Sequence, residues 1–175
     1  MNTATIQKEN HRDNVDQRSG KYLTFFLSGE EYGVEILKVQ EIIECMPITP
    51  VPLASRYILG VINLRGKIHP VMDIKMKFGM GRTQITEESC IIVINASGIM
   101  MGILVDKVSE VVNIDSREID DAPSFGADIN TDYLLGIGKA GGRVNLLLDI
   151  EKVIATADII NMKMAANVQD QAMTT

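Results

Sequence analysis

Hydrophobic and polar residues alternate in short runs from Tyr22 onward, a pattern that predicts β-strands with one buried face. The run Tyr22–Leu27 is rich in aromatic and aliphatic residues, and after a Ser-Gly turn the alternation resumes at Tyr32–Ile36. A third run, Lys38–Ile43, alternates as well. The next segment, Pro47–Ser55, contains three prolines, which interrupt both helices and strand ladders, so it predicts a loop.

A hairpin follows at Gly60–Ile74, where two short apolar strands flank the polar turn Asn63–Lys67. The same frame recurs downstream at a constant offset of 76 (149 minus 73), so that Asp73 meets Asp149. The turn itself is not repeated. The changed residues are Asn63, Leu64 and Arg65 in the first copy and Lys139, Ala140 and Gly141 in the second.

The opening strands recur too, at an offset of 69 (97 minus 28), where Ser28 meets Ser97 and Glu41 meets Glu110. Two blocks of matches at steady offsets indicate an internal duplication. Each copy offers four or five short strands with turns between them, a spacing typical of small antiparallel barrels. We therefore expect an all-β fold with short helices, in which barrel 1 covers about residues 22–78 and barrel 2 about residues 89–153. A unit of about 60 residues is marginally stable alone, so the two barrels should pack together.

The ends of the chain lack the strand pattern. Residues 1–21 carry many charges and almost no apolar side chains, so we expect a disordered tail. Residues 155–166 hold isoleucine and methionine at roughly helical spacing, which predicts an amphipathic C-terminal helix on the barrels, and residues 167–175 should fray. Asp73 and Asp149 each precede a predicted helical turn, where a carboxylate caps free backbone N–H groups.

Composition narrows the class of function. The net charge of −6 and the pI near 4.9 argue against a nucleic-acid or anionic-membrane surface. No signal peptide or membrane span is expected, because the N-terminal segment lacks an apolar run and no stretch approaches about 18 apolar residues. Two cysteines, Cys45 and Cys90, are too few for a disulfide framework, and reduced thiols fit a cytoplasmic protein.

Residues suited to catalysis are few. The two histidines are His11, in the expected tail, and His69, within a hairpin strand, so neither a catalytic triad nor a metal site is expected. The pattern Gly136-x-Gly138-x-x-Gly141 fits the dinucleotide fingerprint but precedes a strand instead of a helix. We therefore expect no enzyme and no cofactor.

The changed turn is the feature that duplication does not explain. Arginine at a turn between apolar strands can form a bidentate pair with a carboxylate of its own barrel or of a partner, and Glu41 is the obvious internal candidate. The pattern leaves two interpretations of Glu41 and Arg65 open: a structural salt bridge, or part of a binding site.

Two segments resemble the CheW family of bacterial chemotaxis coupling proteins: Glu31–Ile42, with the sequence EYGVEILKVQEI, and Gly60–Asp73, with the sequence GVINLRGKIHPVMD. The resemblance extends from about Tyr22 to Ile160. It implies two packed five-stranded SH3-like barrels, in agreement with the duplication. It also implies a non-enzymatic adaptor that joins the cytoplasmic tips of chemoreceptors to the regulatory domain of the histidine kinase CheA. Such a protein would be cytoplasmic and held at membrane receptor arrays through its partners, without membrane insertion or nucleic-acid binding.

Within this resemblance, Glu41 and Arg65 match the family's functional pair. Strand alternation and the duplication indicate further residues of a receptor-binding groove between the barrels: Val39, Ile43, Leu104 and Val108. In the family, the kinase contacts mainly the first barrel. We expect this contact on the proline-rich loop and the strand after it, at Ile48, Pro52, Leu53 and Tyr57.

Three alternatives to the adaptor are compatible with a CheW-like sequence. A CheV-type protein carries a receiver domain, which does not fit in the residues after Ile160, and the homologous domain of CheA would be joined to a kinase. From another class, a small-molecule sensor could use the groove between the barrels as a ligand pocket. Such a sensor would bind a metabolite saturably and have no affinity for receptors.

Overall fold

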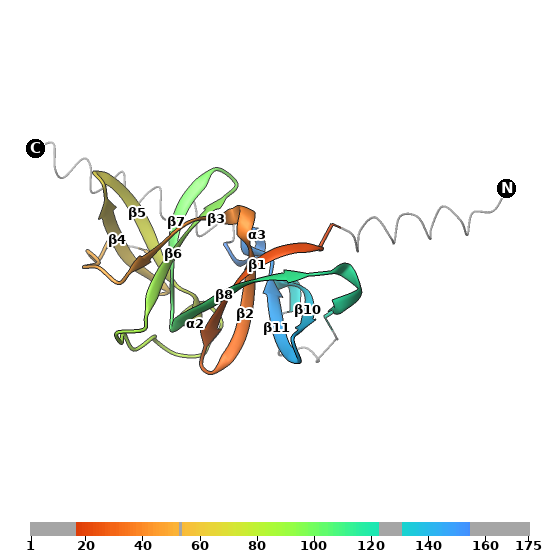
Figure 1. Cartoon of the computed structure of the whole chain (residues 1–175). Coiled ribbons are helices and arrows are strands. Elements are labelled where there is room, and N and C mark those ends of the chain that lie inside the picture. Colours follow the sequence, from red (N-terminus) through yellow and green to blue (C-terminus); the bar gives the residue numbers. More distant parts are fainter. Residues whose placement is uncertain (1–16, 53, 123–130, 155–175) are drawn as a thin grey trace, which may run out of the picture.

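Two β-sheets make up the protein (Figure 1). The computed structural model describes residues 17–52, 54–122 and 131–154. Sheet A has the spatial order β8 (Lys107–Ile114), β1 (Gly20–Leu27), β2 (Glu30–Glu35), β11 (Arg143–Leu148), β10 (Leu134–Ala140) and β9 (Ile119–Asp120). Sheet B has the order β3 (Val39–Glu44), β6 (Cys90–Ala96), β7 (Ile99–Val105), β5 (Lys67–Asp73) and β4 (Ile58–Leu64). The predicted all-β class is confirmed.

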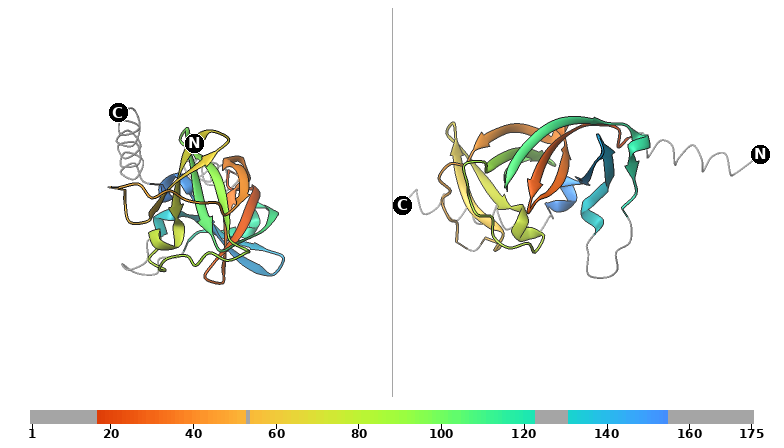
Figure 2. Two further views of the ribbon diagram at one scale, coloured as in Figure 1. Left: turned by 90° about the vertical axis from the view of Figure 1, so that its left-hand side faces the viewer. Right: turned by 60° about the horizontal axis from the view of Figure 1, so that its bottom comes forward.

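Short helical segments connect the strands. They are the 3-10 turns η1 (Ile36–Lys38), η2 (Ser116–Glu118) and η3 (Thr131–Tyr133), and the α-helical turns α2 (Ile74–Lys77) and α3 (Ile150–Val153). In Figure 2 the two sheets lie side by side, with β4 and β5 at one end of the molecule and β10 and β11 at the other. No helix among the described residues is long and apolar enough to cross a membrane.

Each sheet takes strands from both copies of the duplication. The hairpin β1–β2 from the first copy pairs with β8 and β11 from the second, and the hairpin β6–β7 from the second pairs with β3 and β5 from the first. Two of these pairings, β2 with β11 and β5 with β7, are parallel. The expected division into one barrel at about 22–78 and another at about 89–153 therefore does not describe the sheets. The reason lies in η1, which is only three residues long and carries the chain directly from sheet A into sheet B.

A glycine present in both copies lets each sheet curl until its ends meet. Beyond β3, the backbone of Thr49 returns to β4 and exchanges two hydrogen bonds with Val61, of 2.9 and 2.8 Å. A Cβ atom on Gly60 would lie 2.0 Å from the carbonyl oxygen of Thr49, so only glycine allows this approach. In sheet A, β9 returns to β10 in the same way, and a Cβ on Gly136 would lie 2.7 Å from the carbonyl oxygen of Asp120.

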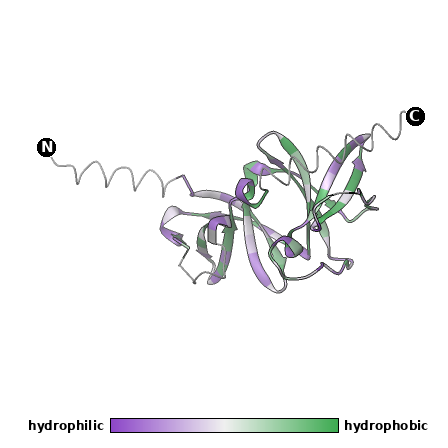
Figure 3. Cartoon of the chain, turned by 180° about the vertical axis from the view of Figure 1, so that it is seen from behind, coloured by the Kyte–Doolittle hydropathy of each residue, from purple (hydrophilic) through white to green (hydrophobic). Residues whose placement is uncertain are grey.

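Three apolar clusters fill the molecule, and Figure 3 shows that hydrophobic residues concentrate along the strands. The largest cluster lies between the sheets, because it combines residues of β1 and β2 with residues of β6 and β7. A second cluster is built from β4, β5, β6 and β7 and lies inside sheet B. The third is built from β1, β8, β9 and β11 and lies inside sheet A.

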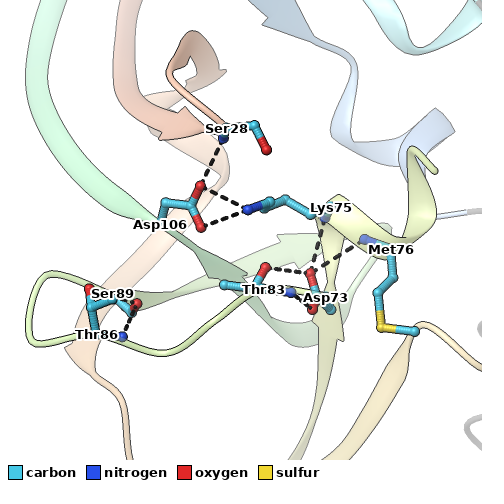
Figure 4. Close-up of polar contacts among 8 residues, drawn as sticks. All are labelled: Ser28, Asp73, Lys75, Met76, Thr83, Thr86, Ser89 and Asp106. Atoms are coloured by element: carbon cyan, nitrogen blue, oxygen red, sulfur yellow. Dashed lines mark hydrogen bonds and ion pairs between the residues drawn. The ribbon is translucent and has the colours of Figure 1, made fainter. Parts of the chain in front are cut away.

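The sheets are also joined by two ion pairs, one at each short helix. The helix carries the basic residue in one pair and the acidic residue in the other. At the first, Asp106 accepts a hydrogen bond of 2.8 Å from the backbone N–H of Ser28 and pairs with Lys75 of α2 (Figure 4). At the second, the acid is on the helix: Glu151 of α3 pairs with Lys38 at 2.9 Å and is also hydrogen-bonded by the backbone of Ser97. These hydrogen bonds and the charge of Lys38 lower the pKa of Glu151.

The predicted caps are confirmed. Asp73 accepts hydrogen bonds from the backbone N–H groups of Lys75 (3.1 Å) and Met76 (3.4 Å) at the start of α2. Asp149 accepts one from Lys152 (3.4 Å) at the start of α3.

The predicted tail ends too late. Strand β1 begins at Gly20, because its backbone hydrogen bonds to β8 start two residues before the first apolar side chain. Arg18 lies outside the strand but also has a partner, since it pairs with Asp121 at 2.9 Å. Predictions for residues 1–16, for Leu53, for the helix at 155–166 and for the end at 167–175 lie outside the described residues.

Candidate partner-binding surface

The side chains of Arg65 and Glu41 join the two ends of sheet B. Arg65 stands in the turn between β4 and β5 and donates through Nη1 to Oε2 of Glu41 at 2.8 Å, while Nη2 bonds to Oε1. Glu41 belongs to β3, at the opposite end of the strand order from β4. The hydrogen bond from Arg65 lowers the pKa of Glu41, and the same hydrogen bond raises the pKa of Arg65. The predicted bidentate pair is therefore formed.

The turn that carries Arg65 has an unfavourable backbone conformation for a side chain. Arg65 has φ 54° and Gly66 has φ 82°, both in the left-handed region. The side chain of Asn63 supports the turn by accepting a 2.9 Å hydrogen bond from the N–H of Gly66. The turn thus holds an arginine side chain outward, 73% exposed, beside a glutamate that is 30% exposed.

The second copy contains a related pair that the sequence analysis missed. Glu110, the counterpart of Glu41, pairs with Arg143 of β11. The position of Arg65 is taken by Gly141, so the arginine comes from two residues further along the turn. The signal available in the sequence was the repeated glutamate together with an arginine just after the turn in the second copy.

The two arginines differ in how firmly they are held. Arg143 also lies 3.7 Å from Oε2 of Glu31, a buried carboxylate, so it is placed between two acids. The counterpart of Glu31 in sheet B is Met100, at the offset of 69, which offers no charge to Arg65. Arg65 therefore has one acidic partner among the described residues, and its guanidinium can exchange that partner at lower cost.

The residues predicted to line a groove fall into two groups. Val39 and Val108 are half-buried and pack on the apolar cluster between the sheets, from β3 and β8 respectively. Ile43 packs instead on the cluster inside sheet B. The prediction for Leu104 is wrong: it is 0% exposed within that same cluster, because both faces of the central strand β7 are covered.

Two exposed residues extend the apolar surface at β3 and β8. Ile42 is 44% exposed and lies opposite Ile92, and Val111 is 50% exposed and lies opposite Leu23. Both partners belong to the cluster between the sheets. Ile42 and Val111 are counterparts at the offset of 69, so the duplication was the signal that could have found them.

Three of the residues expected at a kinase contact are described, and they differ in how they pack. Ile48 packs on the cluster inside sheet B, whereas Tyr57 packs on the cluster between the sheets, with Nζ of Lys77 4.4 Å from its ring centre. Pro52 is exposed. No group of three or more metal-binding side chains gathers anywhere in the part of the chain that the structure describes.

Comparisons with known proteins agree on one family. The model of the CheW-like domain matches residues 21–158. The chain is 39% identical over 139 residues to the chemotaxis protein CheW of Klebsiella aerogenes, covering 79% of this chain and 84% of that protein. It is 34% identical over 152 residues to the chemotaxis protein CheW of Bacillus subtilis, covering 87% and 94%.

A solved structure shows the same fold. The crystal structure of the scaffolding protein TtCheW from Thermoanaerobacter tengcongensis superimposes with a TM-score of 0.72 at 34% identity, over 80% of this chain and 90% of that one. Together with the family match over residues 21–158, this likeness shows that the chain belongs to the CheW family.

Proposed function

We propose that this protein is a non-enzymatic chemotaxis adaptor that couples the cytoplasmic tips of chemoreceptors to the regulatory domain of the histidine kinase CheA. Membership of the CheW family supports this role, since relatives are named chemotaxis and scaffolding proteins. The protein would then act on the cytoplasmic side of the membrane, held at receptor arrays by its partners.

The observation that carries the proposal is the guanidinium of Arg65, which is 73% exposed, has one acidic partner among the described residues and belongs to a residue in the left-handed conformation. A residue with a Cβ costs roughly 1 kcal/mol more than glycine in that conformation. The related turn in the second copy uses Gly141 and Gly142 and avoids this cost. Exposed ion pairs add little net stability, so the pair with Glu41 does not account for the arginine. Ser28 and Ser97 adopt the same conformation, so what points to a partner is the exposed guanidinium of Arg65 rather than its conformation alone.

We place the receptor contact on Glu41 and Arg65 together with the apolar residues of the edge strands β3 and β8. A helical receptor tip needs a stripe of apolar side chains to receive its own, with charged residues at the side to fix its orientation. The apolar residues are Val39, Ile42, Val108 and Val111. We place the kinase contact on other residues, Ile48, Pro52, Leu53 and Tyr57, because an adaptor has to bind kinase and receptor at the same time.

Calorimetric titration tests the proposal, with the CheA regulatory domain and a receptor cytoplasmic fragment as separate titrants. We expect saturable binding of both by the wild-type protein. Arg65→Gly should lose receptor binding, keep kinase binding and remain at least as stable as Arg65→Ala, because glycine relaxes the turn. Arg143→Ala is the matched control: it removes the related arginine and should leave both titrations unchanged.

The outcomes separate the alternatives. Failure of the wild-type protein to bind either titrant would contradict the adaptor role and favour the small-molecule sensor. Retained receptor binding by a folded Arg65→Gly variant would assign Arg65 to the scaffold.

A further inference from the structure

A hollow beside the proline-rich segment is separate from the Glu41–Arg65 surface. It has a volume of about 300 Å³ and lies between the segment after β3 and the linker that follows α2. Its lining is mostly apolar: Met46, Pro47, Ile48, Pro50, Leu59, Arg82, Thr83, Ile85 and Leu104. A space of this size and character suits one large aliphatic or aromatic side chain.

The walls of the hollow are held in place. On one side, Pro47 and Pro50 restrict the backbone, and Thr49 is fixed to β4 by its two hydrogen bonds to Val61. On the other side, Thr83 donates from its N–H (2.8 Å) and its hydroxyl (2.7 Å) to the buried carboxylate of Asp73 (Figure 4). A site with fixed walls loses little entropy when it is filled.

Charges of opposite sign flank the hollow. Arg82 lies at its rim and is exposed. A neighbouring open hollow of about 620 Å³ shares Ile85 and carries Glu44 and Glu87. None of these three charged residues forms an ion pair with any residue that the structure describes. Ile85, 58% exposed, stands between the positive and the negative side.

We propose that these two hollows form a docking site for an extended protein segment with one large apolar side chain between an acidic and a basic residue. The apolar side chain fills the space over Leu59, the partner's carboxylate pairs with Arg82, and the partner's cation pairs with Glu44 or Glu87. Charge complementarity selects this occupant, because a purely apolar peptide leaves all three charges unpaired. Ile48 belongs both to this hollow and to the proposed kinase contact, so the site adjoins that contact, but its recognition of a charged peptide goes beyond the adaptor function and does not depend on it.

Short synthetic peptides test the proposal without knowledge of the natural partner. The probes are blocked hexapeptides with the sequence Gly-Glu-Leu-Gly-Lys-Gly and three controls, in which Glu and Lys are both Gln, both Lys or both Glu. NMR of methyl-labelled protein reports binding at Met46 and Ile85. We expect saturable shifts at these methyl groups with the Glu/Lys peptide and about tenfold weaker binding of each control.

A charge reversal on the protein separates recognition from misfolding. Arg82→Glu should bind the Lys/Lys peptide about tenfold more tightly than wild type does, and the Glu/Lys peptide correspondingly more weakly. Arg117→Glu, on an exposed arginine of η2 in the other half of the molecule, should leave every preference unchanged. The absence of saturable shifts with all peptides would overturn the proposal. So would an unchanged preference in Arg82→Glu, or equal binding of hexanoate, which would indicate a small-molecule pocket instead.

Discussion

The ammonium group of Lys75 lies 3.2 Å from Oδ2 of Asp106, at a junction where the helix α2 beside sheet B meets the β1–β2 turn of sheet A. The related junction has the opposite polarity, with Glu151 on the helix and Lys38 opposite. Two ion pairs therefore fix the sheets to each other, and exchanging the helix residues Lys75 and Glu151 between the junctions would set like charges together. The first of these pairs is the less exposed one and should matter for stability.

Lys75→Glu should lower the free energy of unfolding by about 2–3 kcal/mol, because it sets two carboxylates against each other in a partly buried site. The double variant Lys75→Glu with Asp106→Lys should recover most of the loss, as the reversed junction at Lys38 shows that the geometry accepts either polarity. Urea unfolding measures both. A double variant as unstable as the sum of the two single variants would contradict the pairing.

Gly60→Ala should lower the free energy of unfolding by more than about 3 kcal/mol, because the new methyl group would overlap the carbonyl of Thr49 and open the end of sheet B. Gly79→Ala is the matched control, since Gly79 also has a positive φ (74°) but no atom near its Cβ position. It should cost only about 1 kcal/mol. Equal losses in thermal unfolding would mean that the contact with Thr49 is unimportant.

Ile42→Asp and Val111→Asp should each leave the protein folded and weaken binding of a receptor cytoplasmic fragment at least about tenfold. Both side chains are about half exposed, so the charge can remain in water. Val108→Asp is a poorer test, because Val108 packs on the cluster between the sheets and its replacement also destabilises the fold. Unchanged receptor binding in both folded variants would remove β3 and β8 from the contact.

His69 should make the protein less stable in mild acid. Burial lowers the pKa of His69 below its ordinary value of 6.5, and the nearby charge of Lys67 lowers it further. The unfolded chain therefore takes up a proton before the folded one, so the stability that neutral His69 provides is present above pH 6.5 and is lost as the pH falls. Urea unfolding between pH 5 and pH 7.5, about the ordinary range of histidine titration, should show this loss, and His69→Gln should remove it. Lys67→Gln should raise the pKa of His69 in an NMR titration, and a variant without that rise would exclude the charge effect.

Repetition in the sequence predicted where the strands lie along the chain better than it predicted which strands pair with each other. The offsets of 69 and 76 match β1 to β6, β3 to β8 and β5 to β11, and the capping roles of Asp73 and Asp149 followed from the same comparison. An offset shows which segments are alike, but not which segments pair. Pairing depends on the direction in which the short turn η1 leads the chain, a property of three residues that hydrophobic periodicity does not encode.

The site was predictable where chemistry was specific and not where it depended on burial. The arginine turn pointed to Glu41, and the pair is formed. Leu104 was misplaced because alternation indicates a strand without showing whether a second layer covers its other face, as happens in β7. Arg143 was not predicted because an arginine that forms the related ion pair need not occupy the equivalent position.

The crossed pairing of the two hairpins has a consequence for biosynthesis. On the ribosome, the β1–β2 hairpin emerges early, but its two neighbours, β8 and β11, are made in the last half of the chain. Sheet B needs no strand beyond β7, which ends at Val105, whereas sheet A cannot close until β11, at Arg143–Leu148, has been made. Such pairings between distant segments give a high contact order, so folding should be slow. The same strand order would also arise from two identical half-length chains that each lent a hairpin to the other, which makes an ancient swapped dimer, later fused, the simplest origin of this fold.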